Sequence, residues 1–373
     1  MRTILVLMLL LPAAARAQRP ASSVTTLGLD RFWAVAGILA AGREPSAAEW
    51  DSLFAAPGYA ELQARERRRA ALTAGFRAAF LPAARSRRDS LLAAGGWTAR
   101  VIRHVQELPA RRGSIDSFAV RFGSGDGVLH QAAERIRAYL PSGTIERVGL
   151  PRVAFIEFLP DGRGYPGLIV ADAAYNASRS EDALVAFFAH ESFHFYHWAI
   201  GEESAGRVAD RRDATFGALE PLLGKIEEEG VADLADKLPW LGRDSADLAV
   251  WTGQADVSYQ LDYQREMARF SELVSSFDSV VATSLAGSLT PATARAALDS
   301  LLPLEGRPLG MGMARAIVDR LGTARLAATT ADPAAFFAAY DEAATRGGCA
   351  CPRFSNPTSN WLAELIRRRA GRN

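Results

Sequence analysis

The fold is organised around residues 178–201, which read SRSEDALVAFFAHESFHFYHWAIG. Ser178 and Glu181 have the spacing of a capping box, or Ser180 caps the helix directly. Gly201 suits the position just after a helix. No proline or glycine interrupts the segment between these signals, and apolar residues recur on one side at helical spacing. We therefore expect one long helix with a buried face.

His190, Glu191 and His194 form an H-E-x-x-H pattern inside this expected helix. Residues four apart on a helix point the same way, so both imidazoles can bind one zinc ion. Glu191 points to the flank, where it can take a proton from a metal-bound water. The alternative is a buried helix with incidental histidines, but only 5 histidines are available for such a coincidence. The pattern and the helix together predict a zinc site.

Composition and charge exclude several classes of protein. The 373 residues include 49% hydrophobic and 23% charged side chains, which is ordinary for a globular protein with a substantial core. The formal net charge of +1 favours neither nucleic acid nor an anionic membrane as partner. We therefore expect no nucleic acid as partner, and the sequence leaves the oligomeric state open.

The first residues have the pattern of a secretory signal. Arg2 precedes an apolar run, and Ala15-Arg16-Ala17 is a small-x-small cleavage site. We expect residues 1–17 to be a signal peptide, no membrane span after its cleavage, and a secreted or periplasmic protein. An uncleaved membrane anchor is the alternative, although the apolar run is short for a span. Cys349 and Cys351 are the only cysteines, and they could form a strained bridge or stay as thiols.

The remaining chain predicts a mostly helical α+β protein in four parts. These are the signal peptide 1–17, an N-terminal helical region 18–113, a zinc-site core 114–241, and a C-terminal helical region 242–373. Short β-branched or alternating runs predict strands at 117–122, 144–148, 152–159 and 167–171. The last two look like an edge hairpin just before the zinc helix, because Pro-Asp-Gly-Arg-Gly at 160–164 is a turn signal. We expect strand 167–171 to be an exposed edge where a peptide could add a strand. Later helices are expected at 207–219, 224–238, 253–282, 291–302, 310–321, 332–346 and 358–370.

A third protein ligand must come from elsewhere in the chain, because a catalytic zinc takes three. The run at 227–233 reads EEEGVAD, between apolar positions at helical spacing. On a helix Glu229 and Asp233 lie one turn apart on one face. We expect Glu229 to bind zinc and Asp233 to orient a ligand histidine. Gly230 removes a side chain where a second helix could approach.

Other interpretations of these acidic residues stay open. Glu228 could be the ligand, but it lacks an acidic residue four positions later. We expect Glu227 and Glu228 to be solvated, so that loss of Glu228 leaves zinc affinity nearly unchanged. Three acidic residues near turns are weaker candidates: Glu202, Glu203 and Glu220.

These motifs resemble those of the gluzincin peptidases, the thermolysin-like class. The resemblance rests on His190, Glu191 and His194, followed by Glu229 and Asp233 in an E-G-x-A-D run. It implies that Glu229 is the third zinc ligand. The metzincin pattern is excluded, because His and Ile stand at 197 and 200 where that class has Gly and His. The run beginning Leu-Gly-Met-Gly-Met-Ala at 309–314 is similar to the C-terminal helices of exported bacterial zinc peptidases of unknown substrate.

The chemistry expected of such a site needs a base and an oxyanion donor. Glu191 would take the proton from water and pass it to the leaving amine. A donor beyond zinc would stabilise the oxyanion, and we select His197 and Tyr263 for catalytic roles, with Tyr259 and Arg307 as further candidates. The sequence thus predicts a zinc-dependent peptidase that acts on a peptide or protein substrate. Two alternatives are a zinc hydrolase of a non-peptide amide or ester, and an inactive zinc-site fold that binds a partner.

Overall fold

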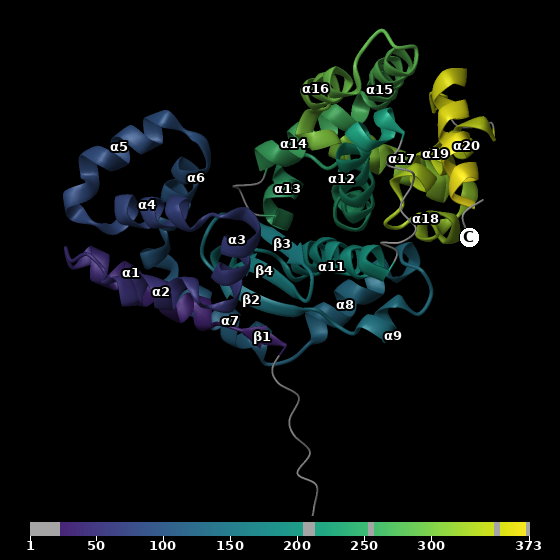
Figure 1. Ribbon diagram of the computed structural model, residues 1–373. Helices are drawn as coiled ribbons and strands as arrows, with labels where there is room; N and C mark the ends of the chain where they lie inside the picture. Colours follow the sequence, from purple (N-terminus) through teal and green to yellow (C-terminus); the bar gives the residue numbers. More distant parts are fainter. Residues whose placement is uncertain (1–22, 204–212, 253–256, 347–350, 371–373) are drawn as a thin grey trace, which may run out of the picture.

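The computed structural model describes residues 23–203, 213–252, 257–346 and 351–370. The expected signal peptide and Cys349 lie outside these residues, and Cys351 is disulfide-bonded. Within the described ranges, no helix combines the length and apolar character needed to cross a membrane. The architecture is mostly helical with one small sheet, so the predicted α+β class is confirmed (Figure 1).

The helices before the central strands are α1 (Leu27–Ala40), α2 (Ala47–Phe54), α3 (Pro57–Glu66), α4 (Arg69–Phe80), α5 (Arg85–Ala94), α6 (Gly96–Val105), α7 (Arg112–Gly123), α8 (Gly127–Ile136) and α9 (Thr144–Val148). Those after the sheet are α10 (Ala173–Ala177), α11 (Glu181–Glu203), α12 (Ala214–Lys237), α13 (Ser245–Thr252), α14 (Val257–Ala268), α15 (Phe270–Leu285), α16 (Pro291–Leu301), α17 (Arg307–Leu321), α18 (Thr323–Ala327), α19 (Pro333–Thr345) and α20 (Asn356–Ala370).

Four strands form a mixed sheet in the order β1-β2-β4-β3. They are β1 (Val24–Thr25), β2 (Arg152–Ile156), β3 (Gly162–Tyr165) and β4 (Leu168–Asp172). β2 pairs in parallel with both β1 and β4, whereas β3 pairs antiparallel with β4. The hairpin therefore consists of β3 and β4, and β3 is its edge strand.

Three strand predictions are wrong. Residues 117–122 lie in α7 and residues 144–148 form α9. Strand 167–171 is not an edge, because β4 lies between β2 and β3. The Gly-rich segment 160–164 was interpreted as a turn, but it lies against a helix and mostly forms β3. β2 and β4 pair directly and in parallel, and β3 forms the edge beyond β4.

Helices cover both faces of β2, which explains its apolar sequence. Alternate residues of a strand point to opposite faces. Phe155 packs against Phe118 of α7, with ring centroids 5.3 Å apart, and against Phe188 of α11 at 6.4 Å. Ala154 and Ile156 point the other way, toward α3 and α1. The sheet thus fixes α11 relative to the N-terminal helices.

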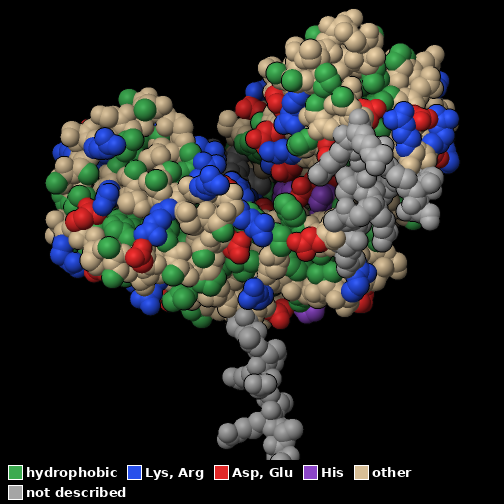
Figure 2. All heavy atoms as spheres, viewed as in Figure 1, with side chains coloured by type: hydrophobic (Ala, Val, Ile, Leu, Met, Phe, Trp, Pro, Cys, Tyr) green, Lys and Arg blue, Asp and Glu red, His purple; other side chains and the backbone are tan. Residues whose placement is uncertain are grey.

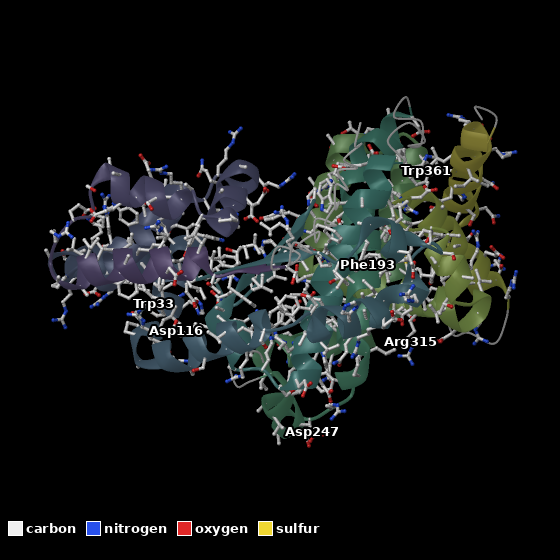
Figure 3. The ribbon with its side chains drawn as sticks, turned by 90° about the horizontal axis from the view of Figure 1, so that it is seen from below. Trp33, Asp116, Phe193, Asp247, Arg315 and Trp361 are labelled. Carbon is white, nitrogen blue, oxygen red and sulfur yellow. The ribbon has the colours of Figure 1, made fainter. Side chains whose placement is uncertain are left out.

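The helix predicted around residue 190 forms and is longer than expected. Ser180 caps it, because its hydroxyl accepts a hydrogen bond from the backbone of Ala183 at 3.3 Å. The helix continues past Gly201 to Glu203. In Figure 3, Phe193 of this helix lies in the interior between Trp33 of the N-terminal helices and Trp361 near the C-terminus. α11 packs against α8, α12 and β3, so it is the central helix of the molecule.

Candidate metal centre

The edge strand β3 lies directly against the H-E-x-x-H helix, because two of its residues have no side chain. A Cβ atom on Gly164 would lie 2.6 Å from the Cβ of His194, and one on Gly162 would lie 2.7 Å from Oε1 of Glu191. Any other residue at these positions would push the strand away from α11. The strand edge is therefore held beside the two histidines and Glu191.

A second close contact brings α17 to α12. A Cβ atom on Gly230 would lie 2.5 Å from the Cα of Gly310, so the two helix backbones touch. The expectation that Gly230 permits a close helix approach is confirmed. The contact places Arg307, in the first turn of α17, beside Glu229, with Nη2 2.9 Å from Oε2.

Three ligand atoms converge between α11 and α12. Nε2 of His190 and Nε2 of His194 are 3.1 Å apart, and Oε2 of Glu229 lies 3.6 Å and 3.7 Å from them. A point about 2 Å from all three atoms exists, which is the usual length of zinc bonds to nitrogen and oxygen. Oε2 of Glu229 is buried beside the positive charge of Arg307, so this oxygen lies where a cation is favoured. The donor set and its spacing fit a zinc ion.

Carboxylates face the outer nitrogen of each of these two histidines. Oε1 of Glu228 lies 2.8 Å from Nδ1 of His194, and Oδ1 of Asp233 lies 3.3 Å from Nδ1 of His190. Such contacts leave Nε2 as the lone-pair nitrogen and fix the ring orientation. Burial lowers the pKa of His194, but Glu228 and Glu229 outweigh it and raise this pKa to about 9. In the absence of a cation, the ring therefore holds a proton that an incoming metal ion must displace.

Glu191 lies beside this triangle without belonging to it. Its side chain is buried, and within the described ranges it forms no hydrogen bond that would engage its oxygens. Burial raises the pKa of Glu191, while the neighbouring His190 and His194 act to lower it. A raised carboxyl pKa brings the group closer to the range in which it can exchange protons near neutral pH.

Asp233 is the most connected group of the site. Its carboxylate accepts hydrogen bonds from the hydroxyl of Tyr263 at 2.7 Å and from Nη2 of Arg307 at 2.9 Å. The ammonium of Lys237 lies 2.6 Å away. Burial alone would raise the pKa of Asp233, but Arg307 and Lys237 hold it well below its ordinary value. Asp233 is therefore a fixed anion behind His190.

The two other residues selected for catalysis contact carboxylates. Nε2 of His197 lies 2.8 Å from Oε2 of Glu227, and its Nδ1 lies 3.7 Å from Oε1 of Glu228. Tyr263 is fully buried and its hydroxyl is engaged by Asp233. Tyr259, one turn earlier on α14, is only partly buried. The geometry thus brings His197 and Tyr263 close to the triangle, behind its carboxylates.

One expectation about the acidic run is wrong. Glu227 and Glu228 are not solvated, because Glu227 is fully buried and Glu228 accepts from His194. Both glutamates face α11, and helical spacing alone did not reveal which histidine each one meets.

Several charged residues near the centre had no predicted role. Lys237 lies four residues after Asp233, so helical spacing could have indicated this ion pair. Arg163 of β3 pairs with Glu66 of α3 at 3.0 Å and with Asp161 at 2.6 Å. Glu66 and Arg163 come from distant segments, and no local pattern predicts their contact.

The centre opens into a hollow between the N-terminal and C-terminal helices. Figure 2 shows histidine side chains inside this hollow, with acidic side chains beside them. β3 lies at its floor, and α3, with Arg65 and Glu66, lies toward the N-terminal side. The histidine side chains are thus visible from this hollow (Figure 2).

Three features define a candidate metal-dependent hydrolase. They are the H-E-x-x-H helix, the candidate third ligand Glu229 on the following helix, and the edge strand beside them. A family described as "putative zinc dependent peptidase (DUF5700)" matches residues 50–347, which is most of the chain. The protein belongs to this family. No curated protein and no solved structure matches it.

Proposed function

We propose that the protein is an exported zinc-dependent peptidase of the gluzincin type, with His190, His194 and Glu229 as the protein ligands of one zinc ion. The observation that carries this proposal is the triangle of ligand atoms with sides of 3.1, 3.6 and 3.7 Å, with Glu191 beside it. When bound, zinc would supply Lewis-acid polarisation of a carbonyl and a bound water of lowered pKa.

Glu191 acts as the general base. Its buried carboxylate has no hydrogen-bonding partner in the described part of the chain, so its oxygens are available to a water or a substrate. It takes a proton from water and returns it to the leaving amine. Glu228 and Asp233 hold the imidazoles in the tautomer that presents Nε2.

β3 provides the surface for an extended substrate. It is an edge strand, and its glycines hold it against α11 next to Glu191 and His194. A peptide that adds to this edge would be fixed in register by main-chain hydrogen bonds. Its scissile bond would then lie beside the ligand triangle. This orientation favours peptides over small amides or esters.

The oxyanion donor is Tyr259 or Arg307. Tyr259 lies one turn from Tyr263 on α14, and it feels the charges of Arg307 and Lys237, which act to lower a pKa that burial raises. Arg307 has Nη2 3.1 Å from Nε2 of His190. Either group could donate to a developing negative charge. Tyr263 and His197 instead position the carboxylates that they contact.

The proposal is tested with Glu191→Gln. This variant keeps the size of the side chain and removes the base, so zinc content should stay at wild-type level while turnover of a peptide library falls by about 10²-fold or more. The matched control is Glu181→Gln, an exposed position in the first turn of the same helix. It should retain full activity and metal.

Two results would contradict the proposal. Peptide cleavage by Glu191→Gln within a few-fold of wild type removes the base from the mechanism. Full zinc content in a His190→Ala/His194→Ala variant shows that the metal binds elsewhere.

A further inference from the structure

A second group of potential ligands lies at the carboxyl ends of β2 and β4. His104 at the end of α6, Glu157 just after β2 and Asp172 at the end of β4 offer ligand atoms within 4.8 Å of one another. Nε2 of His104 lies 2.8 Å from Oδ2 of Asp172 and 3.6 Å from Oε2 of Glu157. None of these residues belongs to the centre at His190.

The surroundings of Glu157 point to a bound ion. Its side chain is 0% exposed, and neither carboxylate oxygen has a hydrogen bond in the described structure. The amide of the next residue, Phe158, donates to Asp172 at 2.9 Å and not to Glu157. The hydroxyl of Tyr59 donates to the carbonyl oxygen of Glu157, not to its carboxylate. A buried carboxylate with two unsatisfied oxygens is costly unless a cation lies against it.

The charges of these three residues also favour a bound cation, because negative charge is in excess. Asp172 and Glu157 carry two negative charges when ionised, and His104 can offer at most one positive charge. A divalent cation bound by a neutral imidazole would balance both carboxylates. The alternative is a proton on Glu157 together with an imidazolium at His104.

The spacing of the donors suits a metal ion. Ligand atoms bound at 2.0–2.2 Å to one tetrahedral ion lie roughly 3.3–3.6 Å apart. The separation of 3.6 Å fits this range, and the separation of 2.8 Å is shorter. Asp172 is held by two backbone amides, those of Phe158 and Tyr175, which orient its carboxylate. One imidazole and two carboxylates form a donor set that suits zinc or manganese.

We propose that His104, Glu157 and Asp172 form a second, structural site for a divalent cation, zinc or manganese. The site joins α6 to the carboxyl ends of the parallel strands β2 and β4. It also fixes the start of the segment 157–161, which leads into the edge strand β3. The ion therefore stabilises the strand beside the centre at His190 without taking part in the chemistry there. The proposal does not depend on the function proposed above.

Metal analysis of the full-length protein, purified with added zinc or manganese, tests this site. Wild type should hold two equivalents per chain, and His190→Ala/His194→Ala should hold one. Glu157→Gln should hold one equivalent and lose several degrees in Tm, while combining all three substitutions should remove both equivalents. Glu107→Gln, an exposed position just after α6, is the control and should keep two. Asp172 is left unchanged, because it also caps α10.

Manganese bound to the His190→Ala/His194→Ala variant gives a second readout by electron paramagnetic resonance. Broadening of the manganese signal in this double variant supports the site if the added substitution His104→Gln abolishes it. His104→Gln also replaces Glu157→Gln as the test variant if Glu157→Gln fails to fold. One equivalent in wild type, all of it lost in His190→Ala/His194→Ala, would overturn the proposal. An unchanged metal content in both Glu157→Gln and His104→Gln would also overturn it.

Discussion

The backbone of Gly230 in α12 lies against that of Gly310 in α17, so closely that a Cβ atom on Gly310 would lie 2.9 Å from the Cα of Gly230. This contact decides where Arg307 lies, because that residue begins α17 three positions earlier. It also fixes Glu229, the neighbour of Gly230, opposite the histidines of α11. The position of the third candidate ligand thus depends on a backbone contact between two glycines.

Gly230→Ala should therefore destabilise the protein, although alanine favours a helix. The added methyl group meets backbone atoms that cannot rotate away, and such overpacking costs about 1–3 kcal/mol or more. The matched control is Gly224→Ala in the same helix, where a Cβ atom would meet nothing within 4 Å. This control should gain up to about 1 kcal/mol from helix propensity. Urea unfolding measures both, and equal effects of the two substitutions would contradict the close contact.

Glu228→Gln should weaken zinc binding, in contrast to the expectation from sequence. Glu228 accepts from Nδ1 of His194, and loss of such a partner typically lowers metal affinity by about 10- to 100-fold. Glu229→Gln should lower it further, because it removes a ligand. Glu181→Gln, at an exposed position in the first turn of α11, is the control and should bind zinc as wild type does. Competition with a chromophoric chelator gives the affinities, and equal values for wild type and Glu228→Gln would exclude this role.

Glu66 ties α3 to the edge strand, and its effect on stability should depend on pH. It accepts from the hydroxyl of Tyr165 at 2.6 Å and from Nε of Arg163 at 3.0 Å. Burial raises the pKa of Glu66, but Tyr165, Arg163 and Arg68 outweigh it and hold this pKa below its ordinary value. A lowered carboxyl pKa contributes stability above the unfolded value, and this stability is lost as pH falls through the folded pKa.

Glu66→Gln should consequently cost roughly 1 kcal/mol at pH 7. The difference from wild type should shrink as pH falls below about 4.5. Thermal unfolding at pH 7, 5 and 4 measures it. The control is Glu61→Gln, because Glu61 forms a surface pair with Arg65 on the same helix. Its substitution should change the stability little at any of the three pH values. A difference that grows toward acid would mean that Glu66 is protonated in the folded protein.

Local patterns predicted the helical part of the site well. His190 and His194 share a helix face because of their spacing, and Glu229 and Asp233 face them from a second helix. Separate helices were expected at 207–219 and 224–238, whereas α12 runs without a break from Ala214 to Lys237 and contains Pro221, a residue that usually interrupts a helix. Apolar packing outweighs this local signal, since Leu222, Leu223 and Ile226 are all buried.

The strands were predicted less well, and so were the partners of the charged groups. Glycines at 162 and 164 indicate a turn by composition, but here they permit a strand to lie against α11. Only the tertiary contact distinguishes these two uses of glycine. Likewise, no spacing along the chain relates Arg307 to Asp233, because the residues meet through packing of α17 on α12.

The two tyrosines of α14 should separate into a donor and a structural residue. Tyr263 is fully buried, and its hydroxyl is held by Asp233, whereas Tyr259 is partly buried and forms no hydrogen bond within the described ranges. If Tyr259 stabilises the oxyanion, Tyr259→Phe should lower kcat by about 10²-fold with zinc content and KM little changed. Tyr263→Phe should cost about 1–3 kcal/mol of stability, because it removes a buried donor from Asp233. Its kcat should fall only a few-fold, since Arg307 and Lys237 still hold that carboxylate. Steady-state kinetics and urea unfolding of both variants distinguish the roles, and a 10²-fold loss of kcat confined to Tyr263→Phe, at unchanged stability, would reverse the assignment.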